Sequence, residues 1–498
     1  MKKNAIRIIS FILLAIMMLS AAACAETPEN PDAGSSSPDA SQNAGPAATT
    51  VPDTPDETTA VNAENILGPR DFGNKTLTFY SRKYNGAWSS DLMAEEQNGT
   101  VLNDAIYKRN SKINEYYHIK LEEIESGKQS FQSDAENRIK TDDTSYQVLY
   151  MGLAEAAKMA IAGYLLDMQE ISNINLEGEW WTQSSNDAWS IGKGQYFATG
   201  DITTTDDMAI RCMYFNKDIL ANLQLKSIYD LVNDNEWVYE KFFEYVEAAK
   251  KDDGDGVVTM SDTFGATAQV TFGFMMTMGS GEMLVKKDAD NVPQLAVNED
   301  NVRFVDVVTY LTDKISNNSG IYLGADADIM SIFTNGQSLF LAEVLLHAQT
   351  MRVNYDVNFG IIPMPKYTAD QENYYQYTTG YCTTVICFPT STRGDDLDMS
   401  SFVVEAMAIE SVETVTPAYY DICLKGRYAD DAESAYMLDI ITASVSSDLA
   451  EIYSWGGFKT TVQDAISSGM SISSVIKKNA PLTQKAITKA LENFLNNQ

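Results

Sequence analysis

The sequence has few basic residues and almost no histidine. Its 498 residues include 36 Lys and Arg against 69 Asp and Glu, a formal net charge of −33, and only two histidines, His118 and His347. Because nucleic-acid affinity depends on clustered Lys and Arg, this balance argues strongly against a DNA- or RNA-binding protein. So few histidines also argue against a histidine-rich metal enzyme.

Long apolar runs and common catalytic motifs are missing as well. No stretch reaches the ~20 apolar residues that a membrane-spanning helix needs, so a polytopic membrane protein is not predicted. There is no G-x-S-x-G motif, no Walker loop and no C-x-x-C pair, and two histidines do not supply a convincing nucleophile–histidine pair. We interpret both histidines as structural. With 44% hydrophobic residues, the chain can still build a large core, and its length predicts two or more domains.

The N-terminus has the features of an export signal. Lys2 and Lys3 precede an apolar run at 8–19, and small residues then lead to Cys24. This order predicts a signal peptide at 1–23. Small residues ending at a cysteine resemble a bacterial lipobox, which implies cleavage before Cys24 and acylation of its thiol; ordinary secretion is the alternative. Cleavage would change the net charge from −33 to −36 by removing three basic residues.

The segment after Cys24 has the composition of a disordered chain. Residues 25–66 contain six prolines and eight acidic residues but no Lys or Arg. Such a segment cannot bury enough apolar surface to offset the entropy of ordering it. We therefore predict that 24–70 comprises a lipid-attachment cysteine and a flexible tether. The body of the protein would then work outside the bacterial cell membrane, anchored to it by lipid.

From Asp71 onward, strand-like and helix-like patterns alternate. This alternation predicts an α/β fold with mainly parallel sheets, whose ligands bind at the carboxyl ends of the strands. The loops after Tyr80 and Tyr150 are therefore the first candidates for a binding site. We expect strands at 75–80, 120–124 and 146–150, and helices at 97–117, 153–164, 239–251, 401–411, 432–444, 462–468 and 482–496.

Five segments, taken in order, resemble segments of one known family. They are Met213–Leu220 (MYFNKDIL), Phe333–Phe340 (FTNGQSLF), Phe359–Lys366 (FGIIPMPK), Val412–Tyr420 (VETVTPAYY) and Met437–Ile441 (MLDII). The family is the extracellular solute-binding proteins of ABC importers, in its family 1 or carbohydrate-binding type. The resemblance extends over roughly residues 71–498.

This resemblance implies a two-lobed fold of the periplasmic-binding-protein kind (type II), with the lobes joined by crossing strands. It implies a first lobe at 71–197 and 342–387, and a second lobe at 198–341 and 388–498 with a helical C-terminal part. The implied function is a receptor, not an enzyme, that closes on a neutral sugar or oligosaccharide and delivers it to ABC permease subunits. No cofactor and no nucleic-acid partner are implied.

The candidate binding residues are aromatic or charged and lie in predicted loops or, for Glu343 and Tyr381, near the implied crossings between the lobes. Sugars stack their C–H faces on aromatic rings and need fixed hydrogen-bond partners for their hydroxyls. Asp201 and Trp455 are candidates because the family often has a Gly-Asp pair and a C-terminal aromatic platform there. We interpret Trp180, Trp181 and Trp237 as core residues. The full candidate set is Arg82, Tyr84, Trp88, Asp201, Glu343, Tyr381 and Trp455.

The run 251–262 matches a calcium-binding loop only in part. Asp253, Asp255 and Asp262 stand at ligand positions, but Lys251 stands where the first acidic ligand belongs. Position 12 of such loops is normally a bidentate Glu, and here it is Asp262. We favour an acidic turn over a calcium site and predict no metal.

Four cysteines follow Cys24. Cys382 and Cys387 lie in a strand-like run, where five residues at about 3.3 Å each separate them by about 16 Å, beyond the reach of a disulfide. A bond between Cys212 and Cys423 is left open by the sequence. Buried free thiols are the favoured interpretation.

Two other functions remain open at this point. One is a receptor of the same fold for a peptide or another organic solute. The other, less favoured, is a surface glycosidase with paired carboxylates. The acidic excess supplies candidate carboxylates throughout the chain, so their presence does not separate a glycosidase from a receptor.

Overall fold

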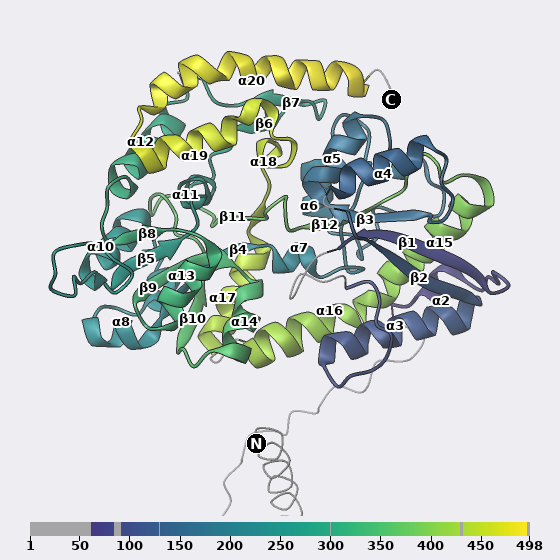
Figure 1. Ribbon diagram of the computed structural model, residues 1–498, viewed down its shortest axis with the longest axis horizontal. Coiled ribbons are helices and arrows are strands. Elements are labelled where there is room, and N and C mark those ends of the chain that lie inside the picture. Colours follow the sequence, from purple (N-terminus) through teal and green to yellow (C-terminus); the bar gives the residue numbers. More distant parts are fainter. Residues whose placement is uncertain (1–60, 84–90, 129, 299, 429–431, 496–498) are drawn as a thin grey trace, which may run out of the picture. The chain divides into compact units, whose positions relative to one another are not determined.

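The computed structural model describes residues 61–83, 91–128, 130–298, 300–428 and 432–495. All of them belong to one of the two units into which the chain divides, Asp56–Gln498. Within this unit two separate sheets, of four and five strands, each form the centre of an α/β body. Figure 1 shows both sheets with their helices. Among the described helices, none combines the length and apolarity needed to span a membrane.

The four-stranded sheet has the order β12-β3-β1-β2. Its strands are β1 (Lys75–Arg82), β2 (Ile119–Ser126), β3 (Val148–Gly152) and β12 (Thr384–Cys387). β1, β2 and β3 are parallel, and β12 runs antiparallel to β3. Three carboxyl strand ends and the start of β12 therefore lie along one edge of the sheet.

Helices cover both faces of this sheet (Figure 1). Successive residues of β1 point to opposite faces: Phe79 packs with α3 and α15, whereas Tyr80 packs with α4. This two-residue alternation explains why β1 is apolar on both sides. The covering helices are α2 (Ala63–Leu67), α3 (Val101–Tyr117), α4 (Phe131–Lys140), α5 (Leu153–Ile161) and α15 (Gly394–Val412).

The five-stranded sheet has the order β10-β4-β9-β5-β8. β5, β8 and β9 are parallel, while β4 is antiparallel to both β9 and β10. The carboxyl ends of β5, β8 and β9 thus share an edge with the start of β4. The strands are β4 (Arg211–Asn216), β5 (Phe264–Ala268), β8 (Ile321–Leu323), β9 (Ser338–Val344) and β10 (Phe359–Ile362).

A large aromatic core fixes the helices around this second sheet. Trp237 is fully buried and contacts Phe242 and Phe340, as expected for a core residue. The helices of this body are α8 (Lys217–Leu223), α9 (Ile228–Asn233), α10 (Tyr239–Ala249), α11 (Phe272–Gly279), α12 (Val302–Ile315), α13 (Asp326–Thr334), α14 (Leu346–Asn354), α17 (Ala432–Ala443), α18 (Leu449–Tyr453), α19 (Phe458–Ser468) and α20 (Ile472–Leu495).

Two segments run antiparallel from one sheet to the other. They pair at Ala198 with Ile386 beside the four-stranded sheet, and at Ile210 with Thr378 beside the five-stranded sheet. A short helix, α7 (Thr205–Met208), interrupts the first segment. The other elements are α6 (Gln183–Trp189), α16 (Val415–Pro417), a π-helix (Ala418–Tyr428), two 3-10 turns (Met168–Glu170 and Trp455–Gly457), and the strand pairs β6 (Val285–Lys287) with β7 (Pro293–Leu295) and β11 (Gln376–Tyr377) with β13 (Val445–Ser446).

Elements on both sides of residue 388 lie with a different sheet from the one that the expected lobe boundaries assign. β10 falls inside 342–387, expected in the first lobe, but it pairs with β4 of the five-stranded sheet from Phe359–Asn216 to Ile362–Met213. α15 falls inside 388–498, expected in the second lobe, but it packs against α3 and the four-stranded sheet. Strand pairing decides the position of β10 and helix packing decides that of α15, and neither leaves a local sequence signal.

The predicted tether also ends earlier than residue 70. Asn62 caps α2 by accepting a hydrogen bond from the Asn65 backbone N–H at 2.8 Å. The Ala63 N–H donates to Glu410 of α15 at 2.8 Å, and Ala63 is buried. Residues 61–70 are therefore part of the four-stranded body, because a cap and a buried contact replace the missing apolar surface.

Candidate functional site

Polar side chains gather at the carboxyl edge of the five-stranded sheet. Arg211 begins β4, Glu343 lies near the end of β9, and His347 lies in the first turn of α14. Gln269 comes directly after β5, and Asp326 begins α13 after β8. In open α/β sheets this edge is where ligands bind.

Arg211 and Glu343 form a buried ion pair. The Arg211 Nη1 donates to Glu343 Oε2 at 3.0 Å, and the residues are 5% and 1% exposed. Oε2 also accepts the Val344 backbone N–H at 2.9 Å and lies 3.5 Å from His347 Nε2. Burial opposes ionisation of Glu343, but Arg211 and His347 outweigh it and lower the pKa of Glu343 to about 2. Removing one partner of such a pair costs about 3–5 kcal/mol, because the other charge stays buried.

The rest of the cluster extends to the surface. Arg211 Nη2 donates to Gln269 Oε1 at 3.2 Å, and the Gln269 amide donates in turn to the exposed Asp326. Burial by itself would lower the pKa of Arg211, but Glu343 raises it, so the guanidinium remains charged. This network holds Arg211 and Glu343 in fixed positions.

Three atoms of the cluster have no hydrogen-bond partner among the described residues. They are Arg211 Nε, Glu343 Oε1 and His347 Nδ1, and each is shielded from solvent. Buried polar atoms are normally paired, because an unpaired one loses its hydration without compensation. The cluster is therefore incomplete as a purely structural network.

The four-stranded sheet places a second group of side chains at its own carboxyl edge. Arg82 ends β1, and its Cζ lies 4.7 Å from the ring centroid of Tyr381. Its Nη2 donates to Tyr381 Oη at 2.8 Å, and its Nη1 lies 3.4 Å from Glu155 Oε2 in the first turn of α5. Burial raises the pKa of Glu155, and Arg82 counteracts this only in part. Tyr381 is 65% exposed, so its ring is available to a ligand.

Charges from both groups act on the thiol of Cys382. Cys382 follows Tyr381 in the turn before β12, and its thiol interacts electrostatically with Arg211, Glu343 and Asp326 on one side and with Arg82 on the other. Burial raises the pKa of this thiol to about 11, so it is not an activated nucleophile. We call these residues together the junction site: Arg82, Glu155, Tyr381 and Cys382 from the four-stranded side, and Arg211, Gln269, Asp326, Glu343 and His347 from the five-stranded side.

Comparisons with known proteins bear on the fold. No family model matches the sequence, and no curated protein matches it. Solved structures do match. A galacto-N-biose/lacto-N-biose I-binding protein of an ABC transporter from Bifidobacterium longum, in complex with lacto-N-biose, has a TM-score of 0.55 at 12% identity, covering 85% of this chain and 98% of that one.

Two further structures give the same result. An ABC substrate-binding protein from Listeria monocytogenes, in complex with cycloalternan, has a TM-score of 0.54 at 10% identity, covering 84% of this chain and 99% of that one. A maltose/maltodextrin-binding domain from Bdellovibrio bacteriovorus, bound to maltotriose, has a TM-score of 0.51 at 12% identity, covering 84% and 100%. The chain has the two-lobed fold of these sugar-binding proteins. The predicted α/β fold class is thereby confirmed, and each sheet is the centre of one lobe.

Two of the predicted site residues, Arg82 and Tyr381, are in direct contact. Glu343 lies at the carboxyl edge of the other sheet, and its charge and that of Arg82 both act on the Cys382 thiol. Tyr84 and Trp88 lie outside the described residues, as does Cys24.

Asp201 and Trp455 lie in other surroundings. Asp201 Oδ1 accepts a hydrogen bond from Thr416 Oγ1 at 2.6 Å, and burial raises the pKa of Asp201 to about 6. Trp455 is 5% exposed and stacks on Tyr453 with ring centroids 4.7 Å apart and an interplanar angle of 5°. Neither residue has a described contact with Arg82 or Glu343, and their role in binding remains a prediction.

The sequence analysis did not single out Arg211 or Glu155, and it interpreted His347 as structural only. Arg211 is a charged residue inside an otherwise apolar strand, which is a usable signal because buried charges need partners. His347 follows Glu343 by only four residues, across the turn from β9 to α14. Only the pairing of β4 with β9 brings these residues together.

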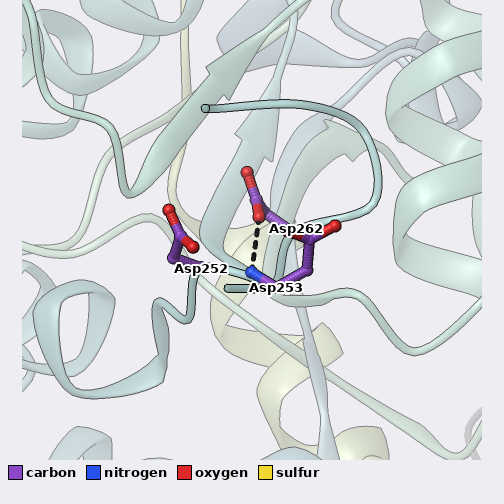
Figure 2. Close-up of side chains that lie close together, drawn as sticks. All are labelled: Asp252, Asp253 and Asp262. Atoms are coloured by element: carbon purple, nitrogen blue, oxygen red, sulfur yellow. Dashed lines mark hydrogen bonds between the residues drawn. The ribbon is translucent and has the colours of Figure 1, made fainter. Parts of the chain in front are cut away.

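The acidic turn at 251–262 lies away from this edge of the sheet. One carboxylate oxygen each from Asp252, Asp253 and Asp262 lies within 4.8 Å of the other two. Figure 2 shows these three side chains. Asp262 accepts the backbone N–H groups of Asp253 and Thr259 at 2.9 and 2.8 Å, and Asp252 accepts that of Gly254 at 2.7 Å. The carboxylates thus stabilise the turn itself, and we assign no metal to it.

The described cysteines are free thiols. Cys212 and Cys387 are buried and Cys382 is partly exposed. Burial raises the pKa of both buried thiols. The favoured interpretation of these three residues as unpaired is confirmed; nothing is described for the Cys423 side chain.

Proposed function

We propose that the protein is an extracytoplasmic receptor that captures a neutral sugar or oligosaccharide between its two lobes and delivers it unchanged to the membrane subunits of an ABC importer. The observation that supports this most directly is the junction site within a sugar-binding-protein fold. An exposed tyrosine lies beside Arg82 at the carboxyl edge of one sheet, and a buried Arg211–Glu343 ion pair lies at the carboxyl edge of the other.

The chemistry of the junction site suits an amphipathic, uncharged ligand. The Tyr381 ring offers a stacking surface, and Arg82, Arg211 and Glu343 offer hydrogen bonds from charged groups. Such bonds are stronger and more directional than bonds between neutral groups. A ligand that touches both lobes binds the closed arrangement more tightly than the open one and therefore favours closure. A permease that recognises the closed arrangement then receives only the loaded receptor.

A ligand panel tests this function. The mature chain is mixed with lacto-N-biose, maltotriose, cycloalternan and a set of short peptides, and its melting temperature is measured. We expect at least one neutral sugar to raise the melting temperature, because ligand binding to the folded state stabilises it by mass action. Mass spectrometry should recover the sugar unchanged. Stabilisation by peptides alone would indicate a peptide receptor, and a cleaved sugar would indicate a glycosidase.

Anchoring by lipid at Cys24 is a separate part of the proposal. We expect Cys24→Ser to release the protein from the membrane fraction, because at a net charge of −36 after cleavage the chain has no electrostatic attraction to an anionic bilayer. Cell fractionation and immunoblotting measure this. Unchanged membrane association of the variant would contradict lipid attachment.

A further inference from the structure

The unpaired atoms of Arg211, Glu343 and His347 define what a ligand must supply. Glu343 Oε1 can only accept a hydrogen bond, because the carboxylate is ionised next to Arg211. Arg211 Nε can only donate. His347 turns Nε2 toward Glu343 Oε2 at 3.5 Å, so Nδ1 is the ring nitrogen that is left without a partner.

Charged ligand groups do not match this set. A carboxylate or phosphate would accept from Arg211 Nε but would face Glu343 Oε1, a second acceptor with the same charge. An ammonium group would donate to Glu343 but would face the Arg211 guanidinium. A hydroxyl group does both, since it donates one hydrogen bond and accepts others.

We infer that Arg211, Glu343 and His347 form a hydroxyl-recognising subsite that binds two adjacent neutral hydroxyl groups of the sugar and discriminates against uronic acids and amino sugars. One hydroxyl donates to Glu343 Oε1 and accepts from Arg211 Nε, and its neighbour, which can donate or accept, forms a hydrogen bond with His347 Nδ1. This inference rests on the proposed receptor function and specifies the ligand class of its five-stranded lobe.

The subsite is built to keep these atoms in place. Glu343 Oε2 is fully engaged by Arg211, His347 and the Val344 N–H, so Oε1 has a fixed direction. Arg211 Nη2 is held by Gln269, so Nε is fixed as well. A preorganised set of this kind binds the matching ligand without losing rotamer entropy on binding.

Matched variants test the subsite. Glu343→Gln removes the charge, and Glu405→Gln makes the same change at a carboxyl that is also 1% exposed but lies between Trp180 and Trp181 in the other lobe. Using the panel sugar that stabilises the wild type, we expect isothermal titration calorimetry to show at least a tenfold loss of affinity for Glu343→Gln and less than a twofold change for Glu405→Gln.

A second variant separates a loss of binding from a loss of folding. Glu343→Gln leaves Arg211 without its counter-charge, so the double variant Arg211→Met, Glu343→Leu removes both charges together and keeps the volume of the cluster. We expect it to fold with wild-type circular dichroism and to lose sugar affinity at least tenfold. A folded double variant with wild-type affinity would overturn the inference while leaving the receptor function intact.

The two histidines give a direct spectroscopic readout. His118 lies just before β2 of the four-stranded lobe, at the edge opposite the carboxyl ends of its parallel strands. It is exposed, and its Nδ1 lies 3.1 Å from Asp71 Oδ1, so it serves as an internal control. We expect saturating sugar to shift the imidazole ¹⁵N resonances of His347 and not those of His118. A wild type that binds only the uronic acid or amino analogue of a panel sugar would overturn the subsite but not the receptor. A wild type that binds no sugar would overturn both.

Discussion

At the scale of single residues, the two lobes contribute different chemistry to the junction site. The four-stranded lobe presents an exposed ring, Tyr381, supported by Arg82. The five-stranded lobe presents buried charges, Arg211 and Glu343, that are held rigidly. Stacking gives affinity for any sugar face, whereas the fixed charges select the pattern of hydroxyls.

Tyr381→Ala should therefore weaken sugar binding with little effect on folding. We expect a loss of about 1–2 kcal/mol in binding free energy, because one stacking surface is removed. The free energy of unfolding should change little, since the ring is 65% exposed. Calorimetry of Tyr381→Phe, which keeps the ring but loses the bond from Arg82, is the control. Equal losses in both variants would assign the effect to the hydroxyl instead of the ring.

Trp455→Ala should act mainly on stability. The sequence analysis treats this residue as a ligand platform, but the ring is 5% exposed and stacked on Tyr453. Truncating a buried tryptophan costs about 3–5 kcal/mol of unfolding free energy through lost burial and a cavity. Urea denaturation measures this cost. Unchanged stability with weakened sugar binding would restore the role that the sequence predicts.

At the scale of elements, the strands and helices with clear periodicity could be predicted, and those set by long-range packing could not. β1 at Lys75–Arg82 and α10 at Tyr239–Ala249 lie within two residues of the predicted 75–80 and 239–251. α20 begins at Ile472, ten residues before the predicted start, and continues through Pro481. Proline normally favours a helix start, but buried Val475 and Ile476 hold the earlier turns against the protein.

The junction site shows the same division between local and long-range signals. Arg82, Glu343 and Tyr381 could be predicted because charged or aromatic residues near strand ends are a local pattern. Arg211 could not, because its importance depends on the register of β4 against β9, in which Arg211 faces Val344. The three unpaired atoms could not be predicted either, since they depend on side-chain packing between several elements.

Helix α15 is joined to the segment before α6 by one buried carboxyl. Glu405 accepts the indole N–H groups of Trp180 and Trp181 at 2.9 and 3.1 Å and the Asn175 backbone N–H at 3.1 Å. Both tryptophans are buried, so they are core residues as expected. Burial raises the pKa of Glu405 to about 7, although the three donors oppose the shift.

Glu405→Gln should therefore reduce the pH dependence of stability. The folded-state pKa lies above the usual value of 4.5, so the folded form binds more protons than the unfolded form between these values. The contribution of Glu405 to stability is full below pH 4.5 and is lost as the pH rises through about 7. Urea denaturation at pH 5 and pH 8 should show a smaller difference for the variant. An unchanged difference would contradict a raised pKa.

At the scale of the whole molecule, the net charge of −33 and the buried carboxyls both make the folded state less stable as the pH rises. Burial raises the pKa of Asp448 to about 6 and also raises the pKa of Asp207. The pKa of Asp206 is also raised, by burial and by the negative charge of the neighbouring Asp207. The pKa of Glu343 is instead lowered to about 2, so its contribution to stability is lost only as the pH falls from 4.5 toward 2. Between pH 5 and pH 8 the buried groups with raised pKa values dominate.

The free energy of unfolding should accordingly fall as the pH rises from 5 to 8. Each buried carboxyl with a raised pKa favours folding while it is protonated and loses that contribution as it ionises. Self-repulsion among the acidic residues adds to the loss, and salt screens it with a Debye length of about 8 Å at 0.15 M. Urea denaturation at pH 5, 6, 7 and 8, with and without added sodium chloride, separates the two effects, because salt should raise stability at each pH without removing the slope. If the change of unfolding free energy with pH vanishes in salt, the pH dependence belongs to surface charge. An unfolding free energy that rises toward pH 8 would contradict raised pKa values for the buried carboxyls.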